Sequence, residues 1–204
     1  MIEADRVAAV VLAAGASSRF GGQKLLAPLA GTPVLGHVLS AAANLGLAET
    51  ILVLGRDAGA VANAVPEAGE PRVRVVRNPE PERGLSSSLR LGLDAVGPAV
   101  DAALILLGDQ PLVRPAVIAA LFEAWEAAGP PLVVPRYAGG GGPNPVLIAR
   151  GAWPLAAEVR GDRGLGPVMA RRPDLVRQVP VQGDNPDVDT PADLASLTLP
   201  SAAP

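Results

Sequence analysis

The sequence predicts an α/β fold with a doubly wound, mostly parallel sheet in a single domain. Apolar runs of strand length alternate along the chain with stretches of helical periodicity, which is the pattern of repeated βαβ units. The run that begins at Val7 and the run 102–107 are apolar throughout, as are strands buried on both faces of a parallel sheet. Glycine and polar residues follow both runs, so we expect these loops to share the carboxyl edge of the sheet.

Composition agrees with one domain that covers 1–204, with a core at about 6–198. Hydrophobic residues make up 49% of the 204 residues but aromatic residues only 2%, so Ala, Val and Leu must fill the core. The net charge of -3 provides no basic surface for nucleic acid, and we expect no nucleic acid partner. Because there is no cysteine, disulfides and thiolate metal sites are excluded.

Two features bear on the location of the protein. Glu3 and Asp5 precede the first apolar run, which is the wrong charge for a secretory signal peptide. No apolar run approaches the roughly 18 residues that a membrane-spanning helix needs. We therefore expect a soluble, cytoplasmic protein without a membrane partner.

Strands and helices are expected in alternation. After the first strand, Pro33 precedes a helix over 34–45, on which the single histidine, His37, falls off the apolar face and is expected at the surface. Phe122 and Trp125 belong to the apolar stripe of a later helix and are expected in the core. Further strands are expected over 50–54, 73–77, 102–107, 132–135 and 145–148. Further helices are expected over 57–65, 85–96 and 117–125, up to Met169, and from 190 onward.

The loop that follows the first strand has the composition of a phosphate-binding site. Glycines such as Gly15 let backbone N–H groups face an anion without a Cβ in the way. Arg19 and Lys24 add positive charge to the same loop. The spacing excludes a Walker A loop, because Leu25 rather than Ser or Thr follows Lys24, and the dinucleotide pattern G-x-G-x-x-G is also missing. A flexible Gly/Ser turn with two solvated cations is the alternative.

Two further strands are followed by polar residues suited to the same edge of the sheet. Asn78 and Gly84 lie in the loop after 73–77, and three serines, 86–88, begin the next helix. One serine is enough to cap a helix, so the surplus hydroxyls suit a base, a ribose or a phosphate. Asp109 follows the central strand, where ligands of open α/β sheets bind, although an ordinary turn is the alternative.

Three later segments complete the candidate polar loops. Residues 139–142 are four consecutive glycines, which form either a mobile binding loop or a plain linker. Another polar loop begins at Gly161. Near the end of the chain, Asp187 and Asp189 are closely spaced carboxylates, and Thr190 is expected to cap a helix.

Together these features describe a site for a magnesium-nucleoside triphosphate. Asp109 would hold the ion with one of the late aspartates. Residues two apart on an extended segment point to opposite sides, and we favour Asp189 over Asp187 because the helix that begins at Thr190 holds it. The chain has no cysteine, one histidine and no Ser-base motif to activate a hydroxyl. A substrate phosphate, with a second pKa of about 6, is already ionised, so nucleotidyl transfer to a phosphate fits better than a kinase reaction.

The same motifs resemble those of the nucleotidyltransferases of molybdenum cofactor maturation over almost the whole chain. The likeness lies in the segments 12–21 with 24–26, 108–111, 144–146, 161–164 and 187–194. It favours the cytidylyltransferase branch, because Ala13 and Ala14 precede Gly15 where members that use GTP usually have L-A-G-G. Phe20, in place of the usual methionine, and the glycine run 139–142 depart from the family pattern.

The resemblance implies a Rossmann-like nucleotidyltransferase fold. It also implies a reaction in which CTP and molybdopterin-bound molybdenum give the cytosine dinucleotide form and pyrophosphate, with Mg²⁺ as cofactor. The catalytic residues that it implies are Arg19, Lys24 and Asp109. The metal ligands that it implies are Asp109 with Asp187 or Asp189. The nucleotide contacts that it implies are Leu12, Ala13, Ala14, Gly15, Arg19, Lys24, Asn78, Gly84, Ser86, Ser87, Ser88 and Asp109. The residues that it implies for the second substrate, a molybdopterin-type molybdenum cofactor, are Gln110, Asn144, Pro145 and Asp162.

Other functions stay open at this point. A guanylyltransferase or a sugar-phosphate nucleotidyltransferase of the same fold would carry similar loops, although the latter usually has extra length for its sugar. A non-catalytic chaperone that delivers the cofactor to a molybdoenzyme is an alternative of another class. The apoenzyme partner that the resemblance implies belongs to the xanthine dehydrogenase family.

Overall fold

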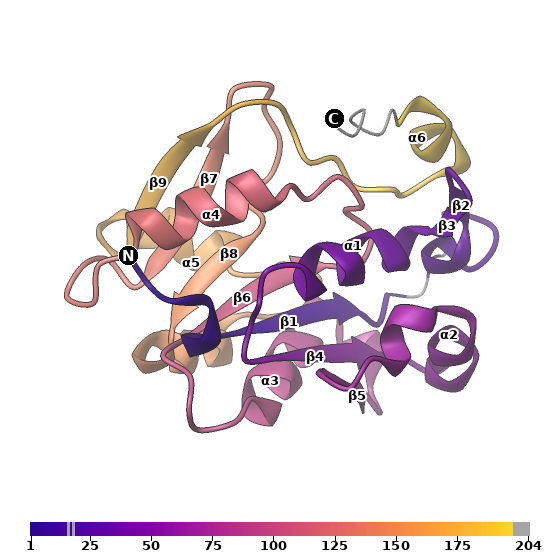
Figure 1. Ribbon diagram of the computed structural model, residues 1–204, viewed down its shortest axis with the longest axis horizontal. Coiled ribbons are helices and arrows are strands. Elements are labelled where there is room, and N and C mark those ends of the chain that lie inside the picture. The colour runs from indigo at the N-terminus through magenta and orange to yellow at the C-terminus, as the bar shows by residue number, and fades with distance from the viewer. Residues whose placement is uncertain (16, 18, 198–204) are drawn as a thin grey trace.

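The computed structural model describes residues 1–15, 17 and 19–197; Ala16 and Ser18 of the glycine-rich loop and residues 198–204 lie outside the described residues. The described chain contains a seven-stranded sheet with the strand order β5-β4-β1-β6-β8-β7-β9 (Figure 1). Its strands are β1 (Val7–Ala13), β4 (Glu49–Leu54), β5 (Val73–Arg77), β6 (Ala102–Leu107), β7 (Leu132–Tyr137), β8 (Val146–Ala149) and β9 (Val176–Val181).

The sheet is parallel except at β8. β1 pairs in parallel with β4 and β6, β4 pairs in parallel with β5, and β7 pairs in parallel with β9. β8 runs antiparallel to both of its neighbours, β6 and β7. The predicted fold class, a doubly wound and mostly parallel sheet, is therefore confirmed.

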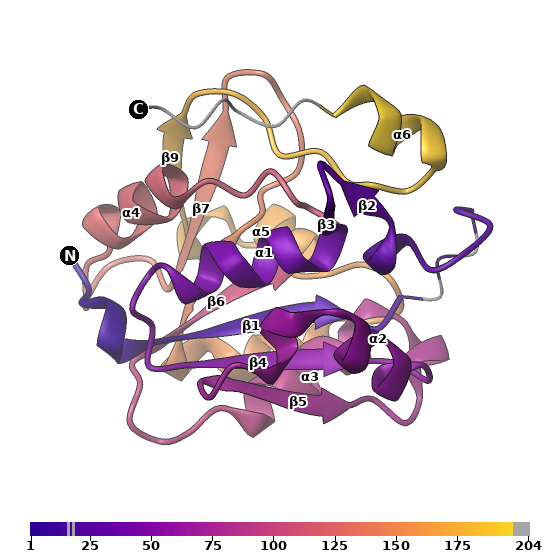
Figure 2. The ribbon, with the colours of Figure 1, turned by 45° about the vertical axis from the view of Figure 1, so that its right-hand side comes forward.

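Helices cover both faces of the sheet (Figure 1, Figure 2). Residues of α1, α2 and α4 pack on one face, and residues of α3 and α5 on the other. The helices are α1 (Val34–Ala43), α2 (Ala58–Ala64), α3 (Leu85–Ala95), α4 (Pro115–Ala124), α5 (Gly166–Arg171) and α6 (Pro191–Ser196). Short 3₁₀ segments are η1 (Ala4–Arg6), η2 (Lys24–Leu26), η3 (Pro66–Gly69), η4 (Pro81–Arg83), η5 (Arg150–Glu158) and η6 (Pro173–Leu175). In both views α6 lies beside the small hairpin of β2 (Pro28–Leu29) and β3 (Thr32–Pro33).

Alternate residues of β1 belong to two separate hydrophobic clusters. Ala9 and Val11 pack with α1 and α4, whereas Ala8 and Val10 pack with α3. Every residue of β1 is buried, as predicted for a strand covered on both faces, and each buried valine contributes roughly 1.5–3 kcal/mol. α3 approaches β1 closely because Gly92 faces it: a Cβ there would lie 2.4 Å from Cγ1 of Val10.

The register of β1 with β6 brings their two following loops together. Leu12 pairs with Leu107, and the N–H of Gly108 donates to the carbonyl of Leu12 at 2.9 Å. A Cβ on Gly108 would lie 2.9 Å from the Cβ of Ala13, so glycine lets the chain leave β6 close against β1. The glycine-rich loop and Asp109 therefore leave the sheet at one edge, as the sequence predicts.

Several elements differ from the sequence prediction. The helices expected over 34–45, 57–65, 85–96 and 117–125 span 34–43, 58–64, 85–95 and 115–124, and the strand expected over 132–135 extends to 137. β9, η5 and the hairpin of β2 and β3 were not predicted from the sequence. His37 was expected at the surface but is half-buried, with Nε2 2.9 Å from the carbonyl oxygen of Leu29. Phe122 and Trp125 lie in the core as predicted. Among the described residues, no helix is long and apolar enough to cross a membrane.

Candidate active site

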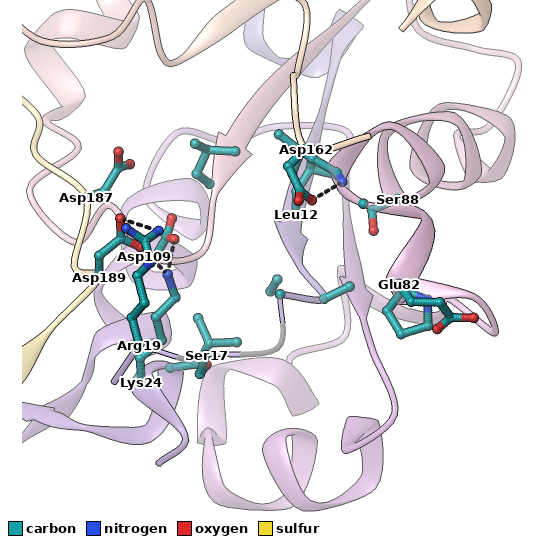
Figure 3. Close-up of a pocket in the computed structure, with 18 residues that line it drawn as sticks. Leu12, Ser17, Arg19, Lys24, Glu82, Ser88, Asp109, Asp162, Asp187 and Asp189 are labelled. Atoms are coloured by element: carbon teal, nitrogen blue, oxygen red, sulfur yellow. Dashed lines mark hydrogen bonds and ion pairs between the residues drawn. The ribbon is translucent and has the colours of Figure 1, made fainter. Parts of the chain in front are cut away.

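A cavity of about 420 Å³ opens at the carboxyl edge of β1 and β6. The glycine-rich loop, the loops after β5 and β6, and the segment before α6 all contribute to its walls. Figure 3 shows that the lining side chains divide into two groups. The charged end consists of Arg19, Lys24, Asp109, Asp187 and Asp189. Leu12, Glu82, Ser88 and Asp162 lie at the opposite end. Gly84 and Leu85, which contact Asp162, and Pro81, which precedes Glu82, also line the cavity.

Lys24 is the centre of the charged end. Its Nζ lies 2.6 Å from Oδ2 of Asp109 and 3.1 Å from Oδ1 of Asp189. The other oxygen of Asp189, Oδ2, lies 2.9 Å from Nη2 of Arg19. Burial opposes the charge on Lys24, but the two carboxylates outweigh it, and the pKa of Lys24 is raised. Lys24 is therefore a protonated cation shared by two carboxylates.

Backbone contacts fix the segment that carries Asp189. The N–H of Val188 donates to the carbonyl of Asp109 at 2.9 Å, which ties this segment to the end of β6. The predicted cap of α6 is confirmed: Oγ1 of Thr190 accepts from the N–H of Asp193, whose carboxylate accepts from the N–H of Thr190. The same carboxylate accepts from the N–H of Asp189 at 3.1 Å. The start of α6 thus holds Asp189 at the cavity.

Asp187 also lines the charged end but has different partners. Its Oδ1 accepts from Nε2 of Gln110 at 2.8 Å, and Oε1 of Gln110 accepts from Nδ2 of Asn185 at 3.0 Å. Burial, followed by the negative charge of Asp109, raises the pKa of Asp187, while the bond from Gln110 opposes that rise. Gln110 and Asn185 are buried, and they orient this carboxylate from behind.

The opposite end is built where α3 meets the loop 161–164. The N–H of Leu85 donates to Oδ1 of Asp162 at 3.3 Å, and the N–H of Ser86 donates to the carbonyl of Gly161 at 3.0 Å. Gly84 precedes them with φ 82° and ψ −174°, a conformation essentially reserved for glycine. The first two N–H groups of α3 are therefore satisfied by the 161–164 loop, and the third, that of Ser87, donates to the carbonyl of Gly84.

The serines of α3 do not cap the helix, contrary to the sequence prediction. The N-cap residue is Gly84, which has no side chain that could accept from the first N–H groups of the helix. Ser87 Oγ donates to the carbonyl of Gly84 at 2.8 Å, and Nδ2 of Asn78 donates to Oγ of both Ser87 and Ser88. Of these polar residues Ser88 reaches the cavity, and Asn78 holds it in place.

A family model described as the MobA-like NTP transferase domain matches residues 9–177. The chain belongs to this family. The charged loop after β1 and the Asp109 loop both fall within the matched region. The match also accounts for the fold, a Rossmann-like sheet whose carboxyl edge carries the cavity.

Individual relatives agree with membership of the MobA-like family. The 2-C-methyl-D-erythritol 4-phosphate cytidylyltransferase of Cereibacter sphaeroides is 41% identical over 127 residues, which cover 59% of this chain and 54% of that protein. The chain thus spans about half the length of this curated relative. The crystal structure of Rv0371c from Mycobacterium tuberculosis has 34% identity and a TM-score of 0.80, covering 94% of this chain and 96% of that one. Its manganese complex has 33% identity and a TM-score of 0.76, with the same coverage. A nucleotidyl transferase from Methanothermobacter has 29% identity and a TM-score of 0.77, covering 93% of this chain and 94% of that one.

Most residues predicted to contact the nucleotide line the cavity of this MobA-like transferase. Those that do are Leu12, Ala13, Ala14, Gly15, Arg19, Lys24, Gly84, Ser88 and Asp109. Asn78, Ser86 and Ser87 do not line the cavity. All three predicted metal ligands line it, as does Asp162, whereas Gln110, Asn144 and Pro145 do not. The carbonyl of Asn144 instead accepts from the hydroxyl of Tyr137 at 3.0 Å.

Several parts of the site were not predicted from the sequence. Pro81, Glu82 and Leu85 line the opposite end, and Glu82 forms an exposed ion pair with Arg56 at 2.9 Å. These residues lie between Asn78 and Ser88, both of which were predicted to contact the nucleotide. Their position between two predicted contacts was therefore a signal that the segment 79–87 could line the site. The hydrogen bond between Gln110 and Asn185 could not be predicted from the sequence, because the two residues are 75 positions apart.

The charged end of the transferase fits a divalent cation that arrives with phosphates. Among the described residues, no group of three His, Asp or Glu side chains forms a ready-made metal site. Asp109 and Asp189 nevertheless face one shared position, now taken by the ammonium of Lys24. Mg²⁺ commonly takes one or two carboxylates and completes its shell with phosphate oxygens and water. Two carboxylates are therefore a sufficient contribution from the protein.

Proposed function

We propose that this nucleotidyltransferase transfers CMP from CTP to the phosphate of a molybdopterin-type molybdenum cofactor, with Mg²⁺ and release of pyrophosphate. The observation that carries the proposal is the charged end of the cavity, where Arg19 and Lys24 meet Asp109 and Asp189. It lies beside Ala13 and Ala14 at the end of β1. The pair Ala13-Ala14 is the feature that favours cytidine over guanosine, and the cytidylyltransferase name of the Cereibacter relative supports the same base.

The residues of the charged end have complementary roles in this reaction. Arg19 and Lys24 bind oxygens of the triphosphate, beside Gly15, which lines the same cavity. Asp109 and Asp189 would hold the metal ion. When bound, the ion neutralises charge on the phosphates and on the departing pyrophosphate.

No general base is needed for the transfer. An oxygen of the acceptor phosphate, already ionised at neutral pH, attacks the α-phosphorus of CTP. The bond from that phosphorus to the oxygen bridging to the β-phosphate breaks, and its electron pair leaves with pyrophosphate. The chain's part is to position the two phosphates and to offset their charge.

The opposite end of the cavity suits the nucleoside. Leu12, Pro81 and Leu85 offer apolar surface for a base, and Ser88 and Asp162 add polar groups. Gln110 and Asn144 do not line the cavity, so their proposed role toward the second substrate is indirect: Gln110 orients Asp187.

A second candidate is cytidylyl transfer to a sugar-type phosphate. The Cereibacter relative, named for 2-C-methyl-D-erythritol 4-phosphate, favours this reading because it is 41% identical over 127 residues, which cover 59% of this chain. The same charged end would serve both acceptors, since both offer a phosphate to the α-phosphorus.

Product analysis tests the proposal. The purified protein is incubated with Mg²⁺, each nucleoside triphosphate, and either molybdenum cofactor or 2-C-methyl-D-erythritol 4-phosphate, and products are identified by mass. We expect the cytosine dinucleotide form of the cofactor and pyrophosphate. Preference for GTP would refute the cytidylyl assignment, and transfer to the polyol phosphate alone would establish the second candidate. Retention of cofactor without any product would identify a carrier.

Matched variants connect the product to the charged end. Asp109→Asn and Lys24→Ala are each expected to lower kcat by about 10²–10³-fold, because each removes a charge that acts on the reacting phosphates. Asp94→Asn removes a carboxylate that is exposed on α3, away from the cavity, and should leave kcat unchanged. Equal activity of all three variants would mean that the charged end takes no part in transfer.

A further inference from the structure

In this structure Lys24 binds the protein's own carboxylates. Its Nζ lies 2.6 Å from Asp109 and 3.1 Å from Asp189, so the ammonium bridges one side chain from the middle of the sequence and one that precedes α6 (Figure 3). A magnesium ion held by the same oxygens would lie about 2.0–2.1 Å from them. The ammonium and the ion would therefore occupy overlapping positions, and both cannot be present there together.

We propose that Lys24 is the resident counter-cation of the free protein and exchanges with the divalent ion when a metal-nucleotide binds. The ammonium leaves Asp109 and Asp189 for the phosphates, and the ion takes its place between the carboxylates. This inference rests on the proposed function only in taking a metal-nucleoside triphosphate as the ligand. It is independent of which base and which acceptor are used.

Charge balance gives the exchange its direction. In the free protein Lys24 and Arg19 together offset the charges of Asp109 and Asp189. A divalent ion that arrived alone would have to displace the ammonium of Lys24 from both carboxylates without offering it a new partner. A metal-triphosphate complex is a net anion, so it brings new partners for both cations along with the ion. Free metal is thus disfavoured and metal-nucleotide is favoured.

The two cations are not equivalent in this exchange. The side chain of Lys24 is 11% exposed and lies between the carboxylates, whereas that of Arg19 is 71% exposed and contacts the outer oxygen of Asp189. Water screens the exposed guanidinium strongly and the enclosed ammonium much less. Lys24 also carries its charge on a flexible four-carbon stem, so the ammonium can move while η2 stays in place.

Binding of Mn²⁺ in the absence of nucleotide tests this directly. Electron paramagnetic resonance measures Kd for Mn²⁺ with the wild type, Lys24→Met and Arg19→Met. We expect Lys24→Met to bind Mn²⁺ at least about tenfold more tightly than the wild type, because it removes the competing charge and vacates the position. Arg19→Met removes the positive charge that contacts Asp189 but leaves the position between the two carboxylates occupied by Lys24. It should therefore change Kd for Mn²⁺ by less than about threefold.

A second measurement adds a CTP analogue with a methylene group between the α- and β-phosphorus atoms, which cannot transfer CMP. With this analogue the advantage of Lys24→Met should disappear, because in the wild type the freed ammonium now binds the phosphates. Lys24→Gln serves as a further variant if Lys24→Met fails to fold, as judged by thermal unfolding. Asp109→Asn should lose Mn²⁺ binding with or without the analogue.

The outcomes separate this inference from the proposed function. If Lys24→Met binds Mn²⁺ no more tightly than the wild type, or if Arg19→Met gains as much, Lys24 is not the resident counter-cation. Unchanged Mn²⁺ binding by Asp109→Asn would overturn the inference as well. Failure to transfer CMP in the product analysis, with tighter Mn²⁺ binding by Lys24→Met, would refute the proposed function and leave the exchange standing.

Discussion

Tyr137 stands at the end of β7, beside the glycine run, and its ring is buried. Its hydroxyl donates to the carbonyl of Asn144 at 3.0 Å, which closes the loop between β7 and β8. Burial raises the pKa of Tyr137 to about 12, against the opposing positive charge of Arg114; the negative charge of Asp184 adds to the rise. The four glycines are thus spanned by a side-chain bond from one strand to the start of the next.

This pKa predicts how stability changes in alkali. Between pH 10 and pH 12 the unfolded chain releases the phenolic proton while the folded protein keeps it, so the free energy of unfolding falls as pH rises. The loss approaches roughly 2–3 kcal/mol by pH 12, at about 1.4 kcal/mol per pH unit. Tyr137→Phe lacks the phenol and should show a smaller decline over this range, measured by urea unfolding at each pH. Parallel declines in both proteins would contradict the assignment.

At the residue scale, sequence identified the reactive groups but not their partners. Arg19, Lys24 and Asp109 were predicted from charge, glycine and strand position, and all three line the cavity. The pairing of Lys24 with Asp189 joins residues 165 positions apart, and only the folded topology decides such a contact. Residue spacing could suggest that Asp187 and Asp189 differ, and their separate partners, Gln110 and Lys24, agree with that difference.

At the element scale, the well-predicted strands are those buried on both faces, such as β1 and β6. β9 was missed because it carries Pro180 and its residues are half-buried or exposed, as is common at an edge where proline is tolerated. The strand 145–148 was predicted, but not its reversed direction. Direction depends on how the loop after β7 returns, and a run of glycines permits many paths.

Gly84 offers a test of how α3 and the 161–164 loop fit together. A Cβ at this position would lie 2.4 Å from the backbone carbon of Gly161 and 2.6 Å from Oδ1 of Asp162. Gly84→Ala should therefore lower stability by about 1–3 kcal/mol from backbone strain alone, measured by denaturant unfolding, and should weaken CTP binding as the loop shifts.

Gly59→Ala is the matched control for this substitution. Gly59 lies inside α2, and a Cβ there meets nothing within 4 Å. It should be neutral or stabilise the protein by up to about 1 kcal/mol, since alanine favours the helix. Similar unfolding curves for the two variants would mean that Gly84 is not constrained as the structure indicates.

At the scale of the whole molecule, fold class followed from a pattern that many residues share. Alternating apolar runs and helical stripes are redundant, so errors of a few residues at the ends of α1 or α4 do not alter the architecture. The sequence information that specifies the cavity is less redundant. The cavity needs segments from the first strand, the middle of the chain and the approach to α6 to meet within hydrogen-bond distance, and short sequence windows do not contain that information.

A ligand that bridges these segments should stabilise the whole protein. With Mg²⁺ and CTP at about 100 times Kd, mass action adds about 2.7 kcal/mol, or roughly 5–10 °C in Tm for a protein of this size. Differential scanning fluorimetry measures the shift. Mg²⁺ alone should give a much smaller shift, since Lys24 competes with it, and Asp109→Asn should reduce the response to Mg²⁺ with CTP. Equal shifts with Mg²⁺ alone and with Mg²⁺ plus CTP would contradict a site that binds the two together.

The ion pairs of Lys24 with residues 85 and 165 positions away have a consequence for biosynthesis. A ribosome adds about 5–20 residues per second, so Asp189 follows Lys24 after roughly 10–30 s. Throughout that interval the nascent chain has its glycine-rich loop but not its full set of carboxylates. β1, β4, β5 and β6 are all made before Asp189 emerges, so cellular nucleotides find no complete site while these strands form. These strands therefore assemble through backbone pairing and burial of their apolar side chains without help from a ligand at the complete site, which exists only once Asp189 has been made.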